Sequence, residues 1–498
     1  MFNKRLSVIV ILAINAKYIH SSLSAWVLAA HLPNSVVIES NINQENADIL
    51  KPVMSHKPTV IAISVYIWNA TKVKKIIELI REHSPETAIV LGGPEATHNA
   101  DYWYSVGADH VFIGEFDKDF IDPYSTKCLK ALEGKLAYIE TSRGCPFSCA
   151  FCLSGDGCNV KFLPLEEAKR RIKKLADSDV RMLKFVDRTF NCNTERAFQI
   201  IEYVIKLKTN KCFHFEVAAD LFDARTLSLL STAPPGRIQF EIGLQSFFEP
   251  ALKASFRKTD LPKAVQNIKT LLSYGNIHIH IDLIAGLPYE TIDDFVNSFN
   301  RAFWIKAHHL QLGFLKLLHG SKMRELYPEI SHSDTPPYEI TKSIWLSAEN
   351  LSKLKRIEHT LEQTYNKGLF VNTFYYVLEV CRDELTPLEL FRKIDESPEN
   401  IFNFCKSLND LNKNVLLKHM ICDFMAKQKG MNMPRFMRIG TYEEYRAIRT
   451  KSEDILGRKI HRSEVAVIPD STINKPCGVF VNLDSRNPVT GLYELYFV

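Results

Sequence analysis

Three closely spaced cysteines are the residues of this chain best suited to chemistry. Cys145, Cys149 and Cys152 are separated by three and two residues. A compact set of three thiolates can hold three irons of a cubic iron–sulfur cluster, which leaves the fourth iron with an open coordination position. An open position on a metal indicates catalysis, because a substrate or cofactor can bind there directly. The spacing therefore predicts a catalytic 4Fe-4S cluster.

Two plainer interpretations of these thiols stay open. A structural zinc site has four ligands, and Cys158 lies near enough in the sequence to be the fourth. A disulfide framework is the other alternative, but eleven cysteines in 498 residues are an ordinary density and an odd number. Residues 1–5 are not followed by a clear signal peptide. We therefore expect iron rather than zinc, and a cytoplasmic location.

The cysteine run also carries a family resemblance. Residues 141–153, with the aromatic Phe151 directly before the last cysteine, resemble the signature of the radical S-adenosylmethionine (SAM) superfamily. In that family the open iron binds the amine and carboxylate of SAM, and an electron from the cluster cleaves the sulfonium to a 5'-deoxyadenosyl radical. The resemblance implies SAM as a cofactor, and an electron donor such as flavodoxin or ferredoxin.

The elements that must position this site alternate between strand-like and helix-like segments over residues 131–325. Six strands and intervening helices predict a partial (β/α)6 barrel, whose working residues lie at the carboxyl ends of the strands. The six predicted strands are residues 136–140, 183–186, 213–218, 237–243, 277–284 and 310–317.

Polar residues gather where these strands end, including Glu241, Asp282 and Glu290. Such groups can bind a sugar diol, an ammonium and an adenine edge, although a solvated cap or a salt bridge explains each one singly. Residues 243–246 and 286–291 resemble the fourth- and fifth-strand motifs of the superfamily, whereas its Gly-Gly-Glu after the second strand is absent. The set that we expect to bind SAM is Asp187, Arg188, Glu216, Gln245, Ser246, Arg257, Ile284 and Gly286.

Residues 1–130 predict a different domain, a flavodoxin-like doubly wound parallel sheet. Its five predicted strands are residues 7–12, 36–39, 60–64, 88–91 and 110–113. Ligands of such sheets bind beyond the carboxyl ends of the strands. A serine followed 28 positions later by two glycines resembles cobalamin-binding domains. The residues that this resemblance implies at cobalamin are Asn15, Ser64, Tyr66, Gly92, Gly93, Gly114 and Glu115.

The match to cobalamin-binding domains is partial. Many of them carry Asp-x-His-x-x-Gly, whose histidine ligates cobalt, and residues 15–20 of this chain lack that pattern. His20 can face the corrin, cap a helix or lie in a core. A domain that packs on the barrel and holds no cofactor also stays an alternative, since a fold does not establish a function.

The remaining residues, 326–498, predict an extension of unknown function. Periodicity is mostly helical over residues 339–426 and strand-like at 465–468, 478–482 and 492–498. Such an extension can cover the barrel mouth and form part of a substrate pocket, because a radical must be kept from water. Stabilisation of the barrel's lower edge is the competing explanation.

The composition describes a globular protein and sets limits on its partners. Hydrophobic residues make up 46% of the chain and charged residues 24%, with a net charge of +5. No apolar run approaches the roughly 20 residues of a membrane-spanning helix. Lys and Arg are scattered among Asp and Glu, so the composition does not support nucleic acid as a partner. We expect no membrane insertion and a small-molecule substrate.

The order of the three regions resembles the cobalamin-dependent class of radical SAM enzymes. Methyl transfer is the commonest reaction of that class, and we expect an oxygen-sensitive enzyme that methylates an unactivated carbon. Rearrangement or oxidative cyclisation without methyl transfer is the alternative reaction. A non-catalytic iron–sulfur or cobalamin sensor is a third interpretation, which the polar strand ends disfavour because a sensor needs no cradle for SAM.

Overall fold

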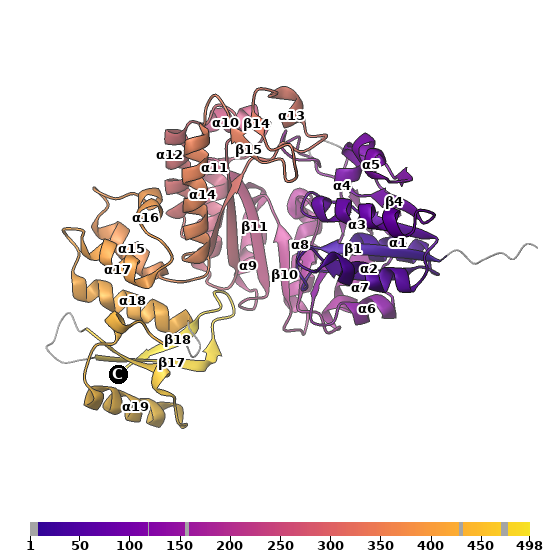
Figure 1. Ribbon diagram of the computed structural model, residues 1–498. Coiled ribbons are helices and arrows are strands. Elements are labelled where there is room, and N and C mark those ends of the chain that lie inside the picture. The colour runs from indigo at the N-terminus through magenta and orange to yellow at the C-terminus, as the bar shows by residue number, and fades with distance from the viewer. Residues whose placement is uncertain (1–7, 118, 155–158, 428–431, 470–476) are drawn as a thin grey trace, which may run out of the picture.

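The computed structural model describes residues 8–117, 119–154, 159–427, 432–469 and 477–498. Figure 1 shows three regions in chain order. An N-terminal sheet with its helices (indigo) lies on one side of a second sheet, and a largely helical C-terminal region (orange to yellow) lies on the other. The second sheet therefore has both other regions as neighbours.

The first region is a five-stranded parallel sheet in the order β2-β1-β3-β4-β5. This is the flavodoxin-like order, and it confirms the predicted fold class. The apolar residues of its strands are buried beneath the surrounding helices. The strands are β1 Ile9–Asn15, β2 Val36–Asn41, β3 Val60–Ser64, β4 Ala88–Gly92 and β5 His110–Val111, and the helices are α1 Leu23–His31, α2 Asn46–Ser55, α3 Ala70–His83, α4 Pro94–His98 and α5 Ala100–Val106.

The second region is a six-stranded parallel sheet in the order β13-β12-β11-β10-β9-β6. Because β13 and β6 are edge strands, the barrel is partial, as predicted. The strands are β6 Leu136–Ile139, β9 Met182–Phe185, β10 Cys212–Glu216, β11 Ile238–Gln245, β12 His278–Ala285 and β13 His309–Phe314. The helices are α6 Thr126–Ala131, α7 Leu165–Ala176, α8 Thr194–Lys206, α9 Ala224–Ser231, α10 Glu249–Ala254, α11 Leu261–Ser273 and α12 Ile292–Phe303, with the 3-10 turns η1 Phe190–Cys192 and η2 Ala219–Leu221.

The two faces of this sheet differ in character. Along β11 and β12, fully buried residues alternate with partly buried ones. The buried set is apolar and packs against the helices, as Ile242 and Ile281 do. The partly buried set, which includes Glu241 and Asp282, lies on the opposite face because successive side chains of a strand alternate. The inner face of the partial barrel is therefore polar.

A short antiparallel hairpin flanks the cysteine loop. Strands β7 (Ser142–Arg143) and β8 (Lys161–Phe162) pair on either side of it. The sequence analysis did not predict this hairpin, because strands of two residues have no periodicity to detect. It fixes the two ends of the loop that carries the three cysteines.

The third region is mostly helical and ends in an antiparallel sheet of order β16-β17-β18, which confirms the predicted type of extension. Helix α14 lies against β13, at the edge of the barrel. The helices are α13 Lys322–Leu326, α14 Ala348–Gln363, α15 Val371–Val380, α16 Pro387–Lys393, α17 Pro398–Lys406, α18 Lys413–Lys427 and α19 Tyr442–Leu456, with η3 Arg435–Met437 and η4 Arg462–Glu464; the strands are β14 Ser331–His332, β15 Ile340–Lys342, β16 Val465–Ile468, β17 Cys477–Arg486 and β18 Tyr493–Phe497.

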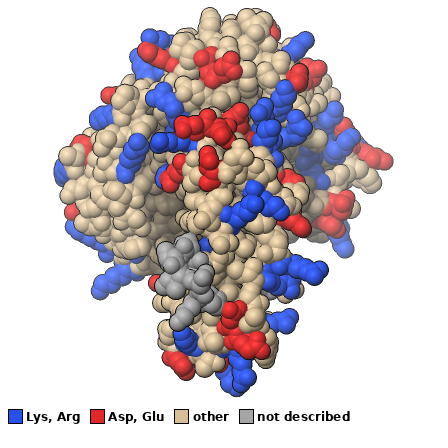
Figure 2. Space-filling view, turned by 90° about the vertical axis from the view of Figure 1, so that its left-hand side faces the viewer, with Lys and Arg blue, Asp and Glu red and all other residues tan. Residues whose placement is uncertain are grey.

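The surface in Figure 2 mixes both signs of charge, with Lys and Arg next to Asp and Glu over most of the visible face. A protein that binds nucleic acid usually gathers its basic residues in one patch or stripe. In the part of the chain that the structure describes, no helix is both long enough and apolar enough to span a bilayer.

Loops at the carboxyl ends of the first sheet contact loops at the carboxyl ends of the barrel. Tyr338, beyond β13, donates a hydrogen bond of 2.5 Å to Glu95, beyond β4. Arg143, beyond β6, donates to the backbone carbonyl of Asp117, beyond β5, and its guanidinium lies 3.5 Å from the Asp117 carboxylate. In both sheets these are the ends where ligands bind. The two ligand-binding edges therefore meet.

Candidate functional site

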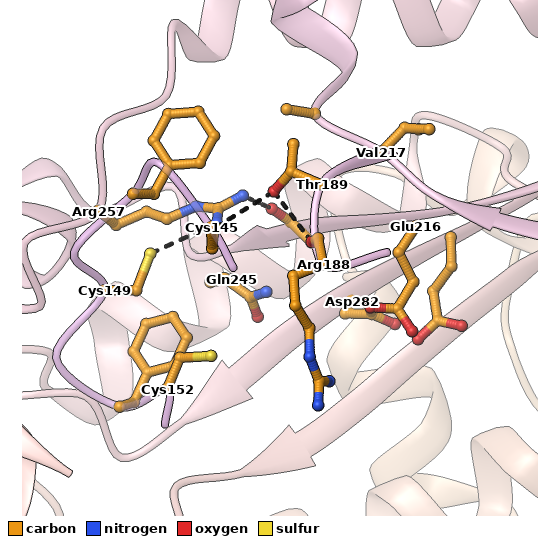
Figure 3. A pocket seen from close by; sticks show the side chains of 15 residues that line it. Cys145, Cys149, Cys152, Arg188, Thr189, Glu216, Val217, Gln245, Arg257 and Asp282 are labelled. Carbon is orange, nitrogen blue, oxygen red and sulfur yellow. Dashed lines mark hydrogen bonds between the residues drawn. The ribbon is translucent and has the colours of Figure 1, made fainter. Parts of the chain in front are cut away.

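One cavity at the carboxyl ends of the barrel strands brings together the cysteines and a set of polar side chains. Figure 3 shows the three thiols and Arg257 on one side, with Glu216 and Asp282 across the space from them. Of the residues that the sequence predicts at SAM, four line this cavity, namely Arg188, Glu216, Gln245 and Arg257. The structure thus places the three cysteines and these four residues around one cavity.

The thiols have hydrogen-bonding groups beside them. The Sγ of Cys145 lies 3.6 Å from the hydroxyl of Thr189. The guanidinium of Arg257 lies 3.6 Å from the Sγ of Cys149. Hydrogen bonds to sulfur tune the reduction potential of iron–sulfur clusters, and a neighbouring cation stabilises a thiolate. These surroundings fit thiolate ligands of a cluster.

The zinc alternative receives no further support, because Cys158 lies outside the described residues. Within the described ranges, no three His, Cys, Asp or Glu side chains converge tightly enough to hold a single metal ion. Every cysteine in those ranges is free, so none forms a disulfide.

Arg257 is held in place on two sides. Besides facing Cys149, it donates a hydrogen bond of 2.6 Å to the carbonyl of Gly243 on β11. Its Nε, like the Oε1 of Gln245, is buried and has no hydrogen-bond partner among the described residues. Buried polar atoms are normally paired, so these two atoms are suited to a ligand that is not part of the chain.

The opposite wall is acidic. Burial and the neighbouring charge of Glu241 raise the pKa of Glu216 to about 7. For Glu241 burial acts in the same direction, but His214 and Lys184 outweigh it and lower its pKa to about 2. The cavity therefore presents one firmly ionised carboxylate beside one that changes charge near neutral pH.

Asp187, which we expected to bind SAM, does not line the cavity. It is only 1% exposed. Its carboxylate accepts hydrogen bonds from the backbone and hydroxyl of Thr141 and from the backbone of Ser142. These bonds fix the start of the cysteine loop to the end of β9. Asp187 is thus a structural residue of the loop.

Ser246 is also directed away from the cavity. It is fully buried, and its hydroxyl donates to Glu290, which also accepts from Ser298. Burial raises the pKa of Glu290 to about 7. This cluster joins the end of β11 to the start of α12, so the Ser246 side chain, which we expected at SAM, lies in a buried network outside the cavity.

Two further predicted residues, Ile284 and Gly286, lie beyond the cavity wall. Gly286 has a φ of +94°, and a Cβ there would come within 2.9 Å of Ile340. Close packing against β15 is sufficient to explain this glycine. No side chain at either position contributes to the cavity as the structure describes it.

In the first region the predicted residues come from neighbouring strands. Ser64 pairs with Gly92 across β3 and β4, and Asn15 ends the adjacent strand β1. The hydroxyl of Ser64 lies 3.1 Å from that of Ser24, which accepts a hydrogen bond from Tyr66. These side chains form one polar edge. The other two, Gly114 and Glu115, follow β5 and are exposed.

Gly93 has a structural reason to be glycine. Its φ is +94°, and a Cβ there would lie 2.7 Å from the backbone oxygen of Val65. The diglycine therefore allows the loops after β3 and β4 to approach each other. This supports the predicted shape of the edge without showing a ligand.

One aromatic residue at this edge, Trp68, is absent from the predicted set. Trp68 is 50% exposed and stacks on Tyr66, with ring centroids 4.3 Å apart and planes 9° apart. Exposed stacked rings offer a flat apolar surface that suits a planar macrocycle such as a corrin. The signal in the sequence was an aromatic residue two positions after Tyr66, directly beyond a strand end.

His20 joins the first region to the barrel. Its Nδ1 lies 2.5 Å from the hydroxyl of Tyr138 on β6. Burial lowers its pKa, and the charges of Lys17 and Lys184 lower it further. A neutral ring hydrogen-bonded to a barrel tyrosine favours a role at the interface between the two regions.

Comparison with known protein families agrees with this geometry. A model of the B12 binding domain matches residues 9–121, and a model of the radical SAM superfamily matches residues 139–302. A family described as a protein of unknown function (DUF4080) matches residues 329–475. The first two domain types imply cobalamin, a 4Fe-4S cluster and SAM as cofactors, which the residues described above fit.

Two curated relatives are methyltransferases. The cobalamin-dependent radical SAM methyltransferase TokK of Streptomyces tokunonensis is 23% identical over 48% of this chain and 44% of its own. The 2-(S-pantetheinyl)-carbapenam-3-carboxylate methyltransferase of Streptantibioticus cattleyicolor is likewise 23% identical, over 48% of this chain and 44% of its own. The chain thus spans less than half the length of these relatives.

Two solved structures share the fold. The match to the cobalamin-dependent SAM radical enzyme OxsB covers 92% of this chain and 82% of the OxsB chain, with a TM-score of 0.53 and 14% sequence identity. The match to the methyltransferase TsrM of Kitasatospora setae covers 67% of this chain and 79% of the TsrM chain, with a TM-score of 0.51 and 13% sequence identity. The chain thus carries a region similar to the B12 binding domain, followed by a region similar to the radical SAM superfamily.

Proposed function

We propose that this protein is a cobalamin-dependent radical SAM methyltransferase that acts on an unactivated carbon of a small molecule. The observation that carries the proposal is the meeting of two carboxyl-terminal edges. Arg143, two residues before Cys145, contacts Asp117 beyond β5, so the loop of the three thiols touches the ligand-binding edge of the B12-type sheet. A methyl carrier and a radical source must act on one substrate, and this arrangement brings their sites together.

When bound, the cluster and SAM supply a 5'-deoxyadenosyl radical, and cobalamin supplies a methyl carrier. The chain's own contribution is to bind, orient and exclude water. Cys145, Cys149 and Cys152 would hold the cluster. Arg257, anchored on Gly243, can grip a carboxylate with two parallel hydrogen bonds.

Glu216 on the acidic wall and Gln245 on the side of Arg257 suit the amine and hydroxyl groups of SAM, as hydrogen-bonding groups on rigid strand ends. Arg188 also lines the cavity and is its second arginine besides Arg257. For cobalamin, the stacked Tyr66 and Trp68 would contact the corrin, beside the polar edge of Ser64.

The partners and location follow from this chemistry. The cluster needs one electron for each radical, so we propose a flavodoxin or ferredoxin as the donor. Free thiols and an oxygen-sensitive cluster suit the reducing cytoplasm. The C-terminal region, which neighbours β13 through α14, is our candidate for the element that selects the substrate.

Anaerobic reconstitution with iron, sulfide and hydroxocobalamin tests the proposal. The protein would be given SAM and a reductant, with cell extract as the source of substrate, and the products separated by chromatography. We expect both 5'-deoxyadenosine and S-adenosylhomocysteine. The first without the second indicates the rearrangement or oxidative cyclisation that we keep as the alternative. If protein that has bound iron forms neither product, the result contradicts the assignment as an enzyme.

A further inference from the structure

Beneath the cavity, one level of the barrel interior is built from titratable side chains. We call this the polar belt; it consists of Lys184 on β9, His214 on β10, Glu241 on β11, His280 on β12 and His309 on β13. The strand register aligns Lys184 with His214, and separately Glu241 with His280 and His280 with His309. Between these two groups His214 pairs with Gln239, and its side chain reaches Glu241 at 3.0 Å. Five adjacent strands thus contribute one member each.

Such a level is unusual inside a barrel, where bulky branched apolar residues usually fill the layers. Burying charged groups costs several kcal/mol per ion unless partners offset it. The side chains of His214 and His280 are only 5% and 12% exposed. A function that needs these groups is therefore the simplest reason for their presence.

The belt divides into two parts. In the first, Glu241 accepts a hydrogen bond of 3.3 Å from Lys184 and lies 3.0 Å from the Nε2 of His214. The hydrogen bond from His214 and the charge of Lys184 hold the pKa of Glu241 at about 2 despite its burial. This part carries a fixed charge near neutral pH and does not exchange protons easily.

The second part forms a chain from the cavity to the surface. The Oδ1 of Asp282, on the cavity wall, lies 2.9 Å from the Nε2 of His280. The rings of His280 and His309 have centroids 4.1 Å apart, and the Nε2 of His309 lies 3.9 Å from the carboxylate of Glu362 on α14. The Glu362 side chain is 46% exposed, so the chain ends in solvent beside the edge strand β13.

The inner pair has unused hydrogen-bonding capacity. Although the His280 Nε2 and the Asp282 Oδ1 are close, their angle is not that of a hydrogen bond, and neither atom has another partner among the described residues. Burial lowers the pKa of His280, but Asp282 and Glu241 outweigh it and raise that pKa despite the opposing charge of Lys184. Burial also raises the pKa of Asp282. Both pKa values are therefore shifted toward the protonated form.

We propose that Asp282, His280 and His309 form a proton path between the cavity and solvent at Glu362. A substrate O–H or N–H group against Asp282 gives its proton to the carboxylate, which passes it to the Nε2 of His280. The proton then moves through His309 to Glu362 and to water. Only bonds to hydrogen break and form, and no electron is transferred.

This path goes beyond methyl transfer and does not depend on it. When an sp3 carbon is methylated by radical steps, its hydrogen leaves as an atom with 5'-deoxyadenosine, so no proton must leave the cavity. A path for protons is needed when the substrate itself loses one. We therefore expect a substrate that carries a hydroxyl or ammonium group next to the reacting carbon.

Nuclear magnetic resonance of the full chain labelled with ¹⁵N-histidine tests the path without cofactors or substrate. The measured quantity is the rate at which the ring N–H of His280 exchanges with water. We expect this rate to fall at least tenfold in His309→Leu and about threefold in Glu362→Gln. In His309→Ala, added imidazole should restore the rate, which a purely structural role of His309 would not allow.

Glu358→Gln is the matched control, because Glu358 lies one turn before Glu362 on α14 and outside the path. It should leave the exchange rate unchanged. If His309→Leu is misfolded by circular dichroism, His309→Gln replaces it as a variant that keeps a hydrogen-bonding side chain but cannot relay a proton. Exchange at the wild-type rate in His309→Leu or His309→Gln overturns the path, whatever products the reconstituted enzyme makes.

Discussion

The two parallel sheets of this protein position functional groups differently. Strand β1 of the first sheet is buried over its whole middle, from Val10 to Ile14, so only its ends can contact a ligand. Strand β12 of the barrel alternates buried and partly buried residues, and His280 and Asp282 face the interior along its length. In a sheet covered by helices on both faces, only residues at the strand ends can contact a ligand. In a sheet covered on a single face, residues along the strands can contact one as well.

The strongest test of this difference removes the cluster ligands. Replacing Cys145, Cys149 or Cys152 with alanine should abolish iron binding and 5'-deoxyadenosine formation, because each thiolate holds one iron. Cobalamin binding to the first sheet should persist. Iron analysis and chromatography measure the loss, and Cys477→Ser on β17 is the control that should keep both properties. Full iron content in any of the three alanine variants would contradict the proposed site.

Gly93→Ala tests the edge of the first sheet. The new Cβ would lie 2.7 Å from the Val65 backbone oxygen at a φ of +94°, so we expect a loss of about 3 kcal/mol in the free energy of unfolding. Cobalamin absorbance should fall with it. Gly114→Ala, where no atom lies within 4 Å, should cost only about 1 kcal/mol. Denaturant unfolding measures both, and equal losses would show that the close approach at Gly93 is unimportant.

Glu290→Gln tests the buried face of the barrel. Burial raises the pKa of Glu290 from an ordinary 4.5 to about 7, so the folded state binds more protons than the unfolded state between these values. The free energy of unfolding should therefore fall by about 2 kcal/mol from pH 5 to pH 7. Above pH 7 the contribution of Glu290 to it should stay nearly constant. The glutamine variant should lack this part of the pH dependence. Unfolding at pH 5, 6, 7 and 8 measures it, and parallel curves would contradict the raised pKa.

Much of both sheets could be predicted from the sequence. Short β-branched runs located all eleven strands of the two parallel sheets to within a few residues, because the pattern of strand and helix is local. Ser64 and Gly92, which the resemblance assigned to one ligand-binding edge, pair across β3 and β4. The two-residue strands β7 and β8 were missed, because nothing local distinguishes them from a loop.

The direction of side chains at the strand ends was the harder problem, although alternation could have solved part of it. Ser246 is two residues from Leu244, on the helix-facing side of β11, whereas Gln245 shares the inner side with Glu241. Asp187 likewise follows Phe185 on the buried side. A motif resemblance assigns adjacent residues of a strand the same role. The alternation of side chains along the strand instead places them on opposite faces of the sheet.

The same alternation would have revealed the inner face. His278, His280 and Asp282 stand at every second position of β12, which predicts one polar face on that strand. That these residues align with Glu241 and His309 depends on register between strands far apart in the chain. Register is set by the assembled sheet, so no single segment contains it.

The smallest expected effect concerns the exposed edge of the first sheet. Trp68→Ala should weaken hydroxocobalamin binding about tenfold, which corresponds to roughly 1.4 kcal/mol and to the loss of one aromatic surface. Since Trp68 is 50% exposed, stability should change by less than about 0.5 kcal/mol. Titration followed by absorbance measures the affinity, with Tyr442→Ala on α19, 77% exposed, as the control. An unchanged affinity would mean that the stacked pair does not contact the corrin, and that the first sheet binds through its polar edge alone.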